Sequence, residues 1–98
     1  MIGEMVKFRK LLDANGIEWH DASDPAEDCF RVDRTHFEYN RFHYSVIHGY
    51  GTYGGYSVFR DKDEGLLELM SNAINRGNPV GWLTADEAIQ IILARDTV

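Results

Sequence analysis

The chain of 98 residues has a single cysteine, Cys29, so it cannot form an internal disulfide. It has no apolar run near the ~20 residues that a membrane-spanning helix needs. Residues 1–7 lack the basic segment and apolar stretch of a signal peptide. Internal repeats, low-complexity tracts and linkers are missing as well. These absences predict one domain, residues 1–98, in a reducing, cytoplasmic setting and without membrane contact.

Positive charge is also scarce, with 10 Lys and Arg against 16 Asp and Glu and a net charge of −6. An acidic balance disfavours duplex nucleic acid, because such binding depends on neutralising phosphates. The charge is uneven, however. Residues 31–60 hold four arginines against two acids, together with all five tyrosines and three of the four histidines. Two acidic ends therefore flank a mildly basic, aromatic centre.

The N-terminal segment has the apolar spacing of a helix over residues 3–15, with Met5, Phe8 and Leu12 on one side. Asn15-Gly16 is a typical left-handed stop for such a helix. A short strand over 17–20 follows.

From Cys29 to Arg60 the chain alternates like a set of strands, and Asn40-Arg41 is the best hairpin turn in it. This turn fixes a register. On one side, expected to be the core face, the pairs are Tyr39 with Phe42, Phe37 with Tyr44, and Thr35 with Val46. On the mostly polar side they are Glu38 with His43, His36 with Ser45, and Arg34 with Ile47.

The remaining elements are a third hairpin strand over 55–60, with Phe59 opposite Tyr44, then a helix over 62–76 and a short strand over 80–83. Thr84-Ala-Asp-Glu87 is a capping box that opens a last helix. The predicted fold is a small α+β domain in the order α-β-β-β-β-α-(β)-α. Its antiparallel sheet has three to four strands, with the helices packed on one face.

Gly49-Tyr-Gly51-Thr-Tyr-Gly54 matches the G-x-G-x-x-G pattern of dinucleotide-binding loops. In that fold the glycines precede a helix, whereas Gly55-Tyr-Ser-Val-Phe looks like a strand. The interpretation adopted is a glycine-rich hairpin loop with tyrosines at its tip and no cofactor.

His36, Glu38 and His43 cluster on the polar side of the predicted hairpin. Two imidazoles and a carboxylate are able to bind a transition metal or to exchange protons. Their spacing follows no metal-site pattern, and exposed His and Glu are common on polar sheet faces. We therefore assign no metal site and no catalytic residue, with a small metal-dependent enzyme kept as an alternative.

Residues 8–19, which end in Gly-Ile-Glu-Trp19, and residues 81–89, Gly-Trp-Leu-Thr-Ala-Asp-Glu-Ala-Ile, resemble short uncharacterised proteins encoded by phages and prophages. The resemblance covers about a quarter of the chain. It implies a mobile-element origin and transfers no activity and no functional residue.

These patterns favour a non-enzymatic, protein-binding accessory module whose partner is another protein or a second copy of itself. An inhibitor of a host system would suit the size and acidity. The alternative is a single-stranded nucleic-acid-binding domain with tyrosines as stacking platforms. Tyr and Arg are frequent interface anchors. The predicted contact residues are Arg34, His36, Glu38, His43, Tyr50, Tyr53, Tyr56 and Arg60.

Overall fold

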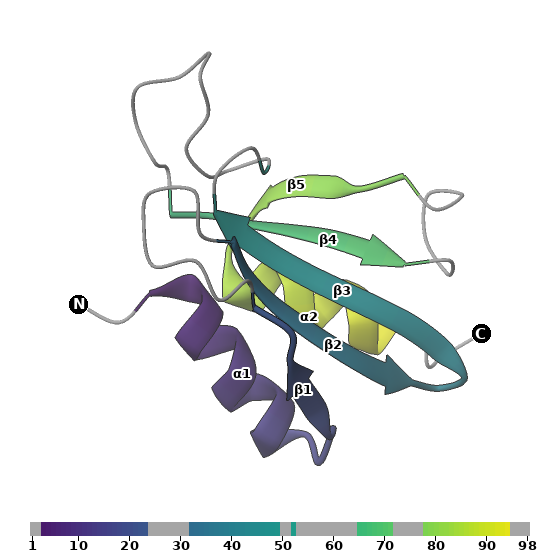
Figure 1. The fold of residues 1–98 in the computed structure, drawn as a ribbon. Coiled ribbons are helices and arrows are strands. Elements are labelled where there is room, and N and C mark those ends of the chain that lie inside the picture. Colours follow the sequence, from purple (N-terminus) through teal and green to yellow (C-terminus); the bar gives the residue numbers. More distant parts are fainter. Residues whose placement is uncertain (1–2, 24–31, 50–51, 53–64, 72–77, 95–98) are drawn as a thin grey trace.

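The computed structural model describes residues 3–23, 32–49, 52, 65–71 and 78–94. Their elements are α1 (Glu4–Ala14), β1 (Trp19–Asp21), β2 (Val32–Tyr39), β3 (Phe42–Gly49), β4 (Leu67–Ser71), β5 (Val80–Leu83) and α2 (Ala85–Ala94). The strands form one antiparallel sheet in chain order, and both helices lie on the same face of it (Figure 1). This confirms the predicted α+β class and its one-sided helices. The sheet has five strands, one more than the upper expectation.

α1 ends at the predicted stop. Gly16 takes φ +69°, and its N–H donates to the Asp13 carbonyl at 3.1 Å. The N–H of Ile17 reaches back to the Leu12 carbonyl at 2.9 Å, and both of these side chains are buried. This hydrogen-bond pattern is a Schellman cap, which needs the left-handed conformation that glycine adopts without strain.

The β2–β3 hairpin has the predicted turn and the predicted register. Asn40 and Arg41 have φ of +53° and +73°, as a two-residue type I′ turn requires. All six predicted cross-strand pairs are present, from Tyr39 with Phe42 to Arg34 with Ile47. The rings of Phe37 and Tyr44 stack at 5.1 Å between centroids and are almost completely buried. The aromatic side of the hairpin is therefore the core face.

The predicted helix over 62–76 is wrong, because Leu67–Ser71 within it is strand β4. Leu67, Leu69 and Ser71 are buried on one side and Met70 is 41% exposed on the other, as the period of a strand requires, although Glu68 on the side of Met70 is also buried. A helix would have placed Met70 on the buried stripe. β3 is a central strand whose second edge needs a partner, and β4 supplies it by pairing Val46 with Leu69.

The predicted pairing of Phe59 with Tyr44 is wrong as well. Tyr44 lies between Phe37 on β2 and Ser71 on β4, so both of its edges are occupied. The predicted strand over 55–60 itself lies outside the described residues.

β5 and α2 follow the sequence prediction closely. The Thr84 N–H donates to Glu87 Oε1 at 3.0 Å, and the Glu87 N–H donates to Thr84 Oγ1 at 3.2 Å, which completes the capping box. The Ala85 N–H donates to Glu4 Oε2 on α1 at 2.7 Å, so the first helix also caps the last. β5 carries an irregular register against β4, and Trp82 has φ +58°.

The core lies between the two helices and the inner face of the sheet. Phe8 of α1 packs against Phe37 of β2, with 5.8 Å between the ring centroids, and α2 packs against β4 and β5. The buried apolar residues are Met5, Phe8, Leu12, Ile17, Phe37, Tyr44, Val46, Leu67, Leu69, Leu83, Ala85, Ala88, Ile89 and Ile92. With the helices confined to this side, the opposite face of the sheet is where polar side chains are displayed.

Candidate functional site

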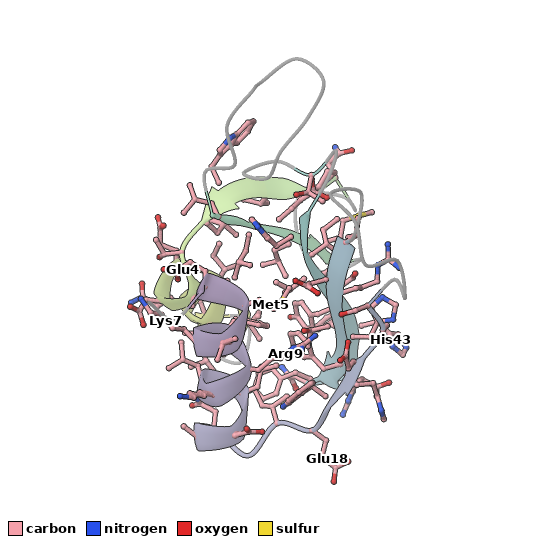
Figure 2. All side chains as sticks on the ribbon, turned by 60° about the vertical axis from the view of Figure 1, so that its left-hand side comes forward. Glu4, Met5, Lys7, Arg9, Glu18 and His43 are labelled. Carbon is pink, nitrogen blue, oxygen red and sulfur yellow. The ribbon has the colours of Figure 1, made fainter. Side chains whose placement is uncertain are left out.

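The face of the sheet turned away from the helices is called the outer face below. Cross-strand partners share a face, so the register of the strands defines it. Its residues are His20, Val32, Arg34, His36, Glu38, His43, Ser45, Ile47, Glu68 and Met70, of which Glu68 is buried. Figure 2 shows His43 on the side of the sheet opposite α1, whereas Met5 and Arg9 lie between α1 and the sheet.

The outer face is hollowed where β1, β2 and β3 run side by side. The hollow has a volume of about 350 Å³ and is lined by Glu18, His20, His36, Phe37, Glu38 and His43. His20 pairs directly with His36, and His36 pairs with Ser45. Three imidazoles and two carboxylates therefore surround one shallow depression that is open to solvent.

Glu38 and His43 face each other at the hairpin end of the hollow. Their Oε2 and Nε2 atoms are 3.4 Å apart, and the two side chains are 60% and 77% exposed. A pair so exposed contributes little to stability, because water screens it. Both groups are therefore available to a partner at small cost.

The metal-dependent alternative gains no geometric support from this cluster. Among residues 3–23, 32–49, 52, 65–71 and 78–94, no three His, Cys, Asp or Glu side chains are arranged to hold a metal ion. Glu38 and His43 approach each other, but His36 lies two residue pairs further along the hairpin.

The structure brings together four of the eight predicted contact residues. Arg34, His36, Glu38 and His43 all lie on the outer face, with Arg34 half-buried and the other three exposed. Tyr50, Tyr53, Tyr56 and Arg60 lie outside the described residues. Of the glycine-rich motif, Gly49 ends β3, and the Thr52 hydroxyl donates to its carbonyl at 2.8 Å.

Sequence reasoning missed Glu18 and His20, which complete the hollow. β1 was expected over 17–20, but its place beside β2 was not assigned, so His20 had no neighbour. The signal in the sequence was an apolar residue, Ile17, followed by a charged one, Glu18, directly before the strand. In the structure Ile17 is buried and Glu18 is exposed. It becomes informative only when β1 is paired with β2.

A second polar cluster lies on the inner side of β1 and β2. Asp21 accepts a hydrogen bond from the Ser23 N–H at 3.0 Å and from Arg9 Nη2 at 3.2 Å. Hydrogen bonds from the Ser23 hydroxyl and N–H, followed by the positive charge of Arg9, hold the pKa of Asp21 below its ordinary value. These contacts join α1 to the sheet, which indicates a structural role.

Neither of the helices described, α1 or α2, has both the length and the apolar character required to cross a bilayer. A functional assignment therefore depends on the outer face and its hollow. Comparison with family models, with curated proteins and with solved structures finds no match to this chain.

Proposed function

We propose that this chain is a non-enzymatic protein-binding module that contacts its partner through the outer face. The observation that supports the proposal is the one-sided fold: helices cover one face of the sheet, and the other displays Arg34, His36, Glu38 and His43. Met70, 41% exposed, adds an apolar group to the same face.

The chemistry of the outer face suits protein contacts of moderate strength. Arg and Met are enriched at interfaces, and a polar surface with a few apolar anchors is typical of partners that also exist apart. The hollow is a depression in the outer face into which a side chain of the partner fits.

Single-stranded nucleic-acid binding is the weaker alternative. Stacking needs exposed rings. In the described part of the hairpin, Phe37 and Tyr44 are buried and Tyr39 and Phe42 pack against the core. A titration of labelled oligonucleotides followed by fluorescence anisotropy at low salt tests this alternative, and tight binding would displace the protein-binding proposal.

The origin and biological role form part of the proposal. The resemblance of residues 8–19 and 81–89 to phage-encoded proteins supports a mobile-element accessory protein. Inhibition of a host system is a role that would suit a small module with an exposed binding face.

Site-specific photocrosslinking tests the proposal. A photoreactive benzoylphenylalanine replaces His36 at the centre of the outer face, and in a matched variant it replaces Lys10, which is exposed on α1. We expect discrete adducts from position 36 in cells that express the protein, and far fewer from position 10.

Charge reversal supplies the control. Arg34→Glu, added to the position-36 variant, should remove the adducts without unfolding the chain, as checked by circular dichroism. Equal adducts from positions 36 and 10, or adducts indifferent to Arg34→Glu, would contradict docking through the outer face.

A further inference from the structure

We propose that the outer face binds a second copy of this chain, with the two sheets stacked face to face about a twofold axis. The inference rests on the proposed function and names its partner. It is carried by a self-complementary order of charges on β2 and by the position of the hollow.

β2 carries charge of both signs on its outer side in an ordered way. Arg34, His36 and Glu38 alternate outward along the strand, so a positive end and a negative end flank a central histidine. Residues 34 and 38 are about 13 Å apart along an extended strand. If a second β2 runs in the opposite direction, this order of charges places opposite charges against each other.

A twofold axis turns this order into matched contacts. Consider an axis that lies between two stacked sheets, runs perpendicular to β2 and passes over His36. It places Arg34 of each copy over Glu38 of the other. The interface is isologous, so each favourable contact occurs twice and the pair closes without leaving a free copy of the same surface.

The hollow provides space for the arginine. Glu38 and His43 line it at the hairpin end of β2 and β3, where Arg34 of the second copy arrives. A guanidinium there meets the Glu38 carboxylate and stacks on an imidazole, both of which are interactions that arginine makes well. Arg34, which is half-buried on its own sheet, is thus the group that the hollow of the second copy receives.

One row of side chains crosses the sheet at His36 and lies along the twofold axis. Each residue of this row therefore faces the same residue of the second copy. The row consists of His20, His36, Ser45 and Met70. Met70, the exposed apolar side chain of the row, meets Met70 of the second copy, so its exposed area is buried against a group of the same kind. Face-to-face packing of sheets with nearly aligned strands is a common arrangement.

Sedimentation equilibrium at neutral pH, with protein up to about 1 mM, tests the inference because it covers weak association. We expect wild type to dimerise. Arg34→Glu and Glu38→Arg should each raise the dissociation constant by roughly tenfold or more, because each places like charges in contact at both ends of the interface.

The decisive variant is the double exchange Arg34→Glu with Glu38→Arg. It restores the match in reversed order and should bring the dissociation constant back to within about threefold of wild type, since the net charge is unchanged. Asp86→Arg on α2 alters the net charge as Glu38→Arg does, but away from the outer face, and should leave the dimer intact. Circular dichroism verifies that each variant is folded.

A wild-type chain that stays monomeric would overturn the inference, as would single variants that dimerise normally or a double variant that is folded but monomeric. The photocrosslinking experiment separates this failure from that of the proposed function. Adducts from position 36 to a different protein would retain docking through the outer face and remove the second copy as its occupant.

Discussion

At the scale of single residues, Arg9 connects more of the structure than any sequence pattern indicates. Its Nε donates to Thr35 Oγ1 at 2.7 Å, and Nη2 donates to the Arg34 carbonyl at 3.2 Å. The guanidinium lies 4.8 Å from the centre of the Trp19 ring, and the Trp19 indole N–H donates to Asp13 at 2.9 Å. One planar side chain thereby attaches α1 to both β1 and β2.

Replacement of Arg9 should cost stability, because the Thr35 hydrogen bond and the contact with the Trp19 ring are lost together. We expect Arg9→Ala to lower the free energy of unfolding by about 1–3 kcal/mol, and Arg9→Lys to recover only part of it. Urea unfolding measures both. The neighbouring, exposed Lys10→Ala is the control, and an equal loss in that variant would show that Arg9 has no special role.

These residue contacts explain why the sequence did not predict the cluster. Arg9 meets Thr35 across 26 positions and Arg34 across 25, and no local pattern encodes such distances. The Asn40-Arg41 turn, in contrast, was predictable because its cause lies in two adjacent residues that accept a positive φ.

At the scale of elements, β4 illustrates how the sheet overrides a local preference. Residues 62–76 have apolar spacing and end signals that favour a helix, yet Leu67–Ser71 pairs with β3. Pairing satisfies the backbone of the central strand and buries Leu67 and Leu69 completely. In this segment the local sequence pattern favours a helix, whereas pairing within the sheet requires a strand, and the pairing determines the structure.

Alanine substitution in β4 distinguishes the strand from the helix. Leu69→Ala should destabilise the protein by about 2–5 kcal/mol because it empties a fully buried site. Met70→Ala should cost under about 1 kcal/mol, since that side chain is largely exposed in the isolated chain. Urea unfolding at low protein concentration measures both changes in the free energy of unfolding. A similarly large decrease for Leu69→Ala and Met70→Ala would instead support a helix with both side chains on its buried side.

The capping box of α2 makes the stability of the element depend on pH. Hydrogen bonds from the Thr84 N–H, and next from its hydroxyl, hold the pKa of Glu87 below its ordinary value of 4.5. A carboxyl with a lowered pKa in the folded state stabilises the protein fully above that ordinary value. The contribution disappears as the pH falls through the lowered pKa.

Glu87→Gln should therefore flatten the loss of stability on the acid side, because the side chain no longer titrates. Thr84→Ala should flatten it as well, since it removes the donor hydroxyl. Thermal unfolding across the acidic range measures the slope. An unchanged slope in both variants would mean that this capping box does not couple proton binding to folding.

At the scale of the whole molecule, the sheet is a meander whose edges, β1 and β5, each carry a tryptophan. The α1–α2 pair covers one face, and the core continues beneath all five strands. A continuous core of this kind predicts that the described elements unfold as one cooperative unit.

Two single-tryptophan variants test this cooperativity. Trp82→Phe leaves Trp19 to report on β1, and Trp19→Phe leaves Trp82 to report on β5. Within each variant, we expect the fluorescence and circular dichroism midpoints to coincide in urea. Separate midpoints would indicate that one edge of the sheet unfolds on its own.

The fold class and the β2–β3 part of the outer face followed from sequence because the hairpin register depends on a local turn. That register put Arg34, His36, Glu38 and His43 on one face. Glu18 and His20 were not placed, because no local sequence pattern indicates that β1 pairs with β2. Single-sequence patterns determine which face a residue takes more readily than which strand lies next to it.

The hydrogen bond from the Ala85 N–H to Glu4 spans 81 positions of the chain. On a ribosome, where synthesis proceeds from the N-terminus, Glu4 leaves the exit tunnel long before Ala85, whose N–H is the donor of this bond, exists. The nascent meander has to wait, with the part of its apolar face that α1 leaves uncovered still exposed, until α2 emerges and packs against it. The core of this protein therefore closes only after residues 85–94 have been synthesised.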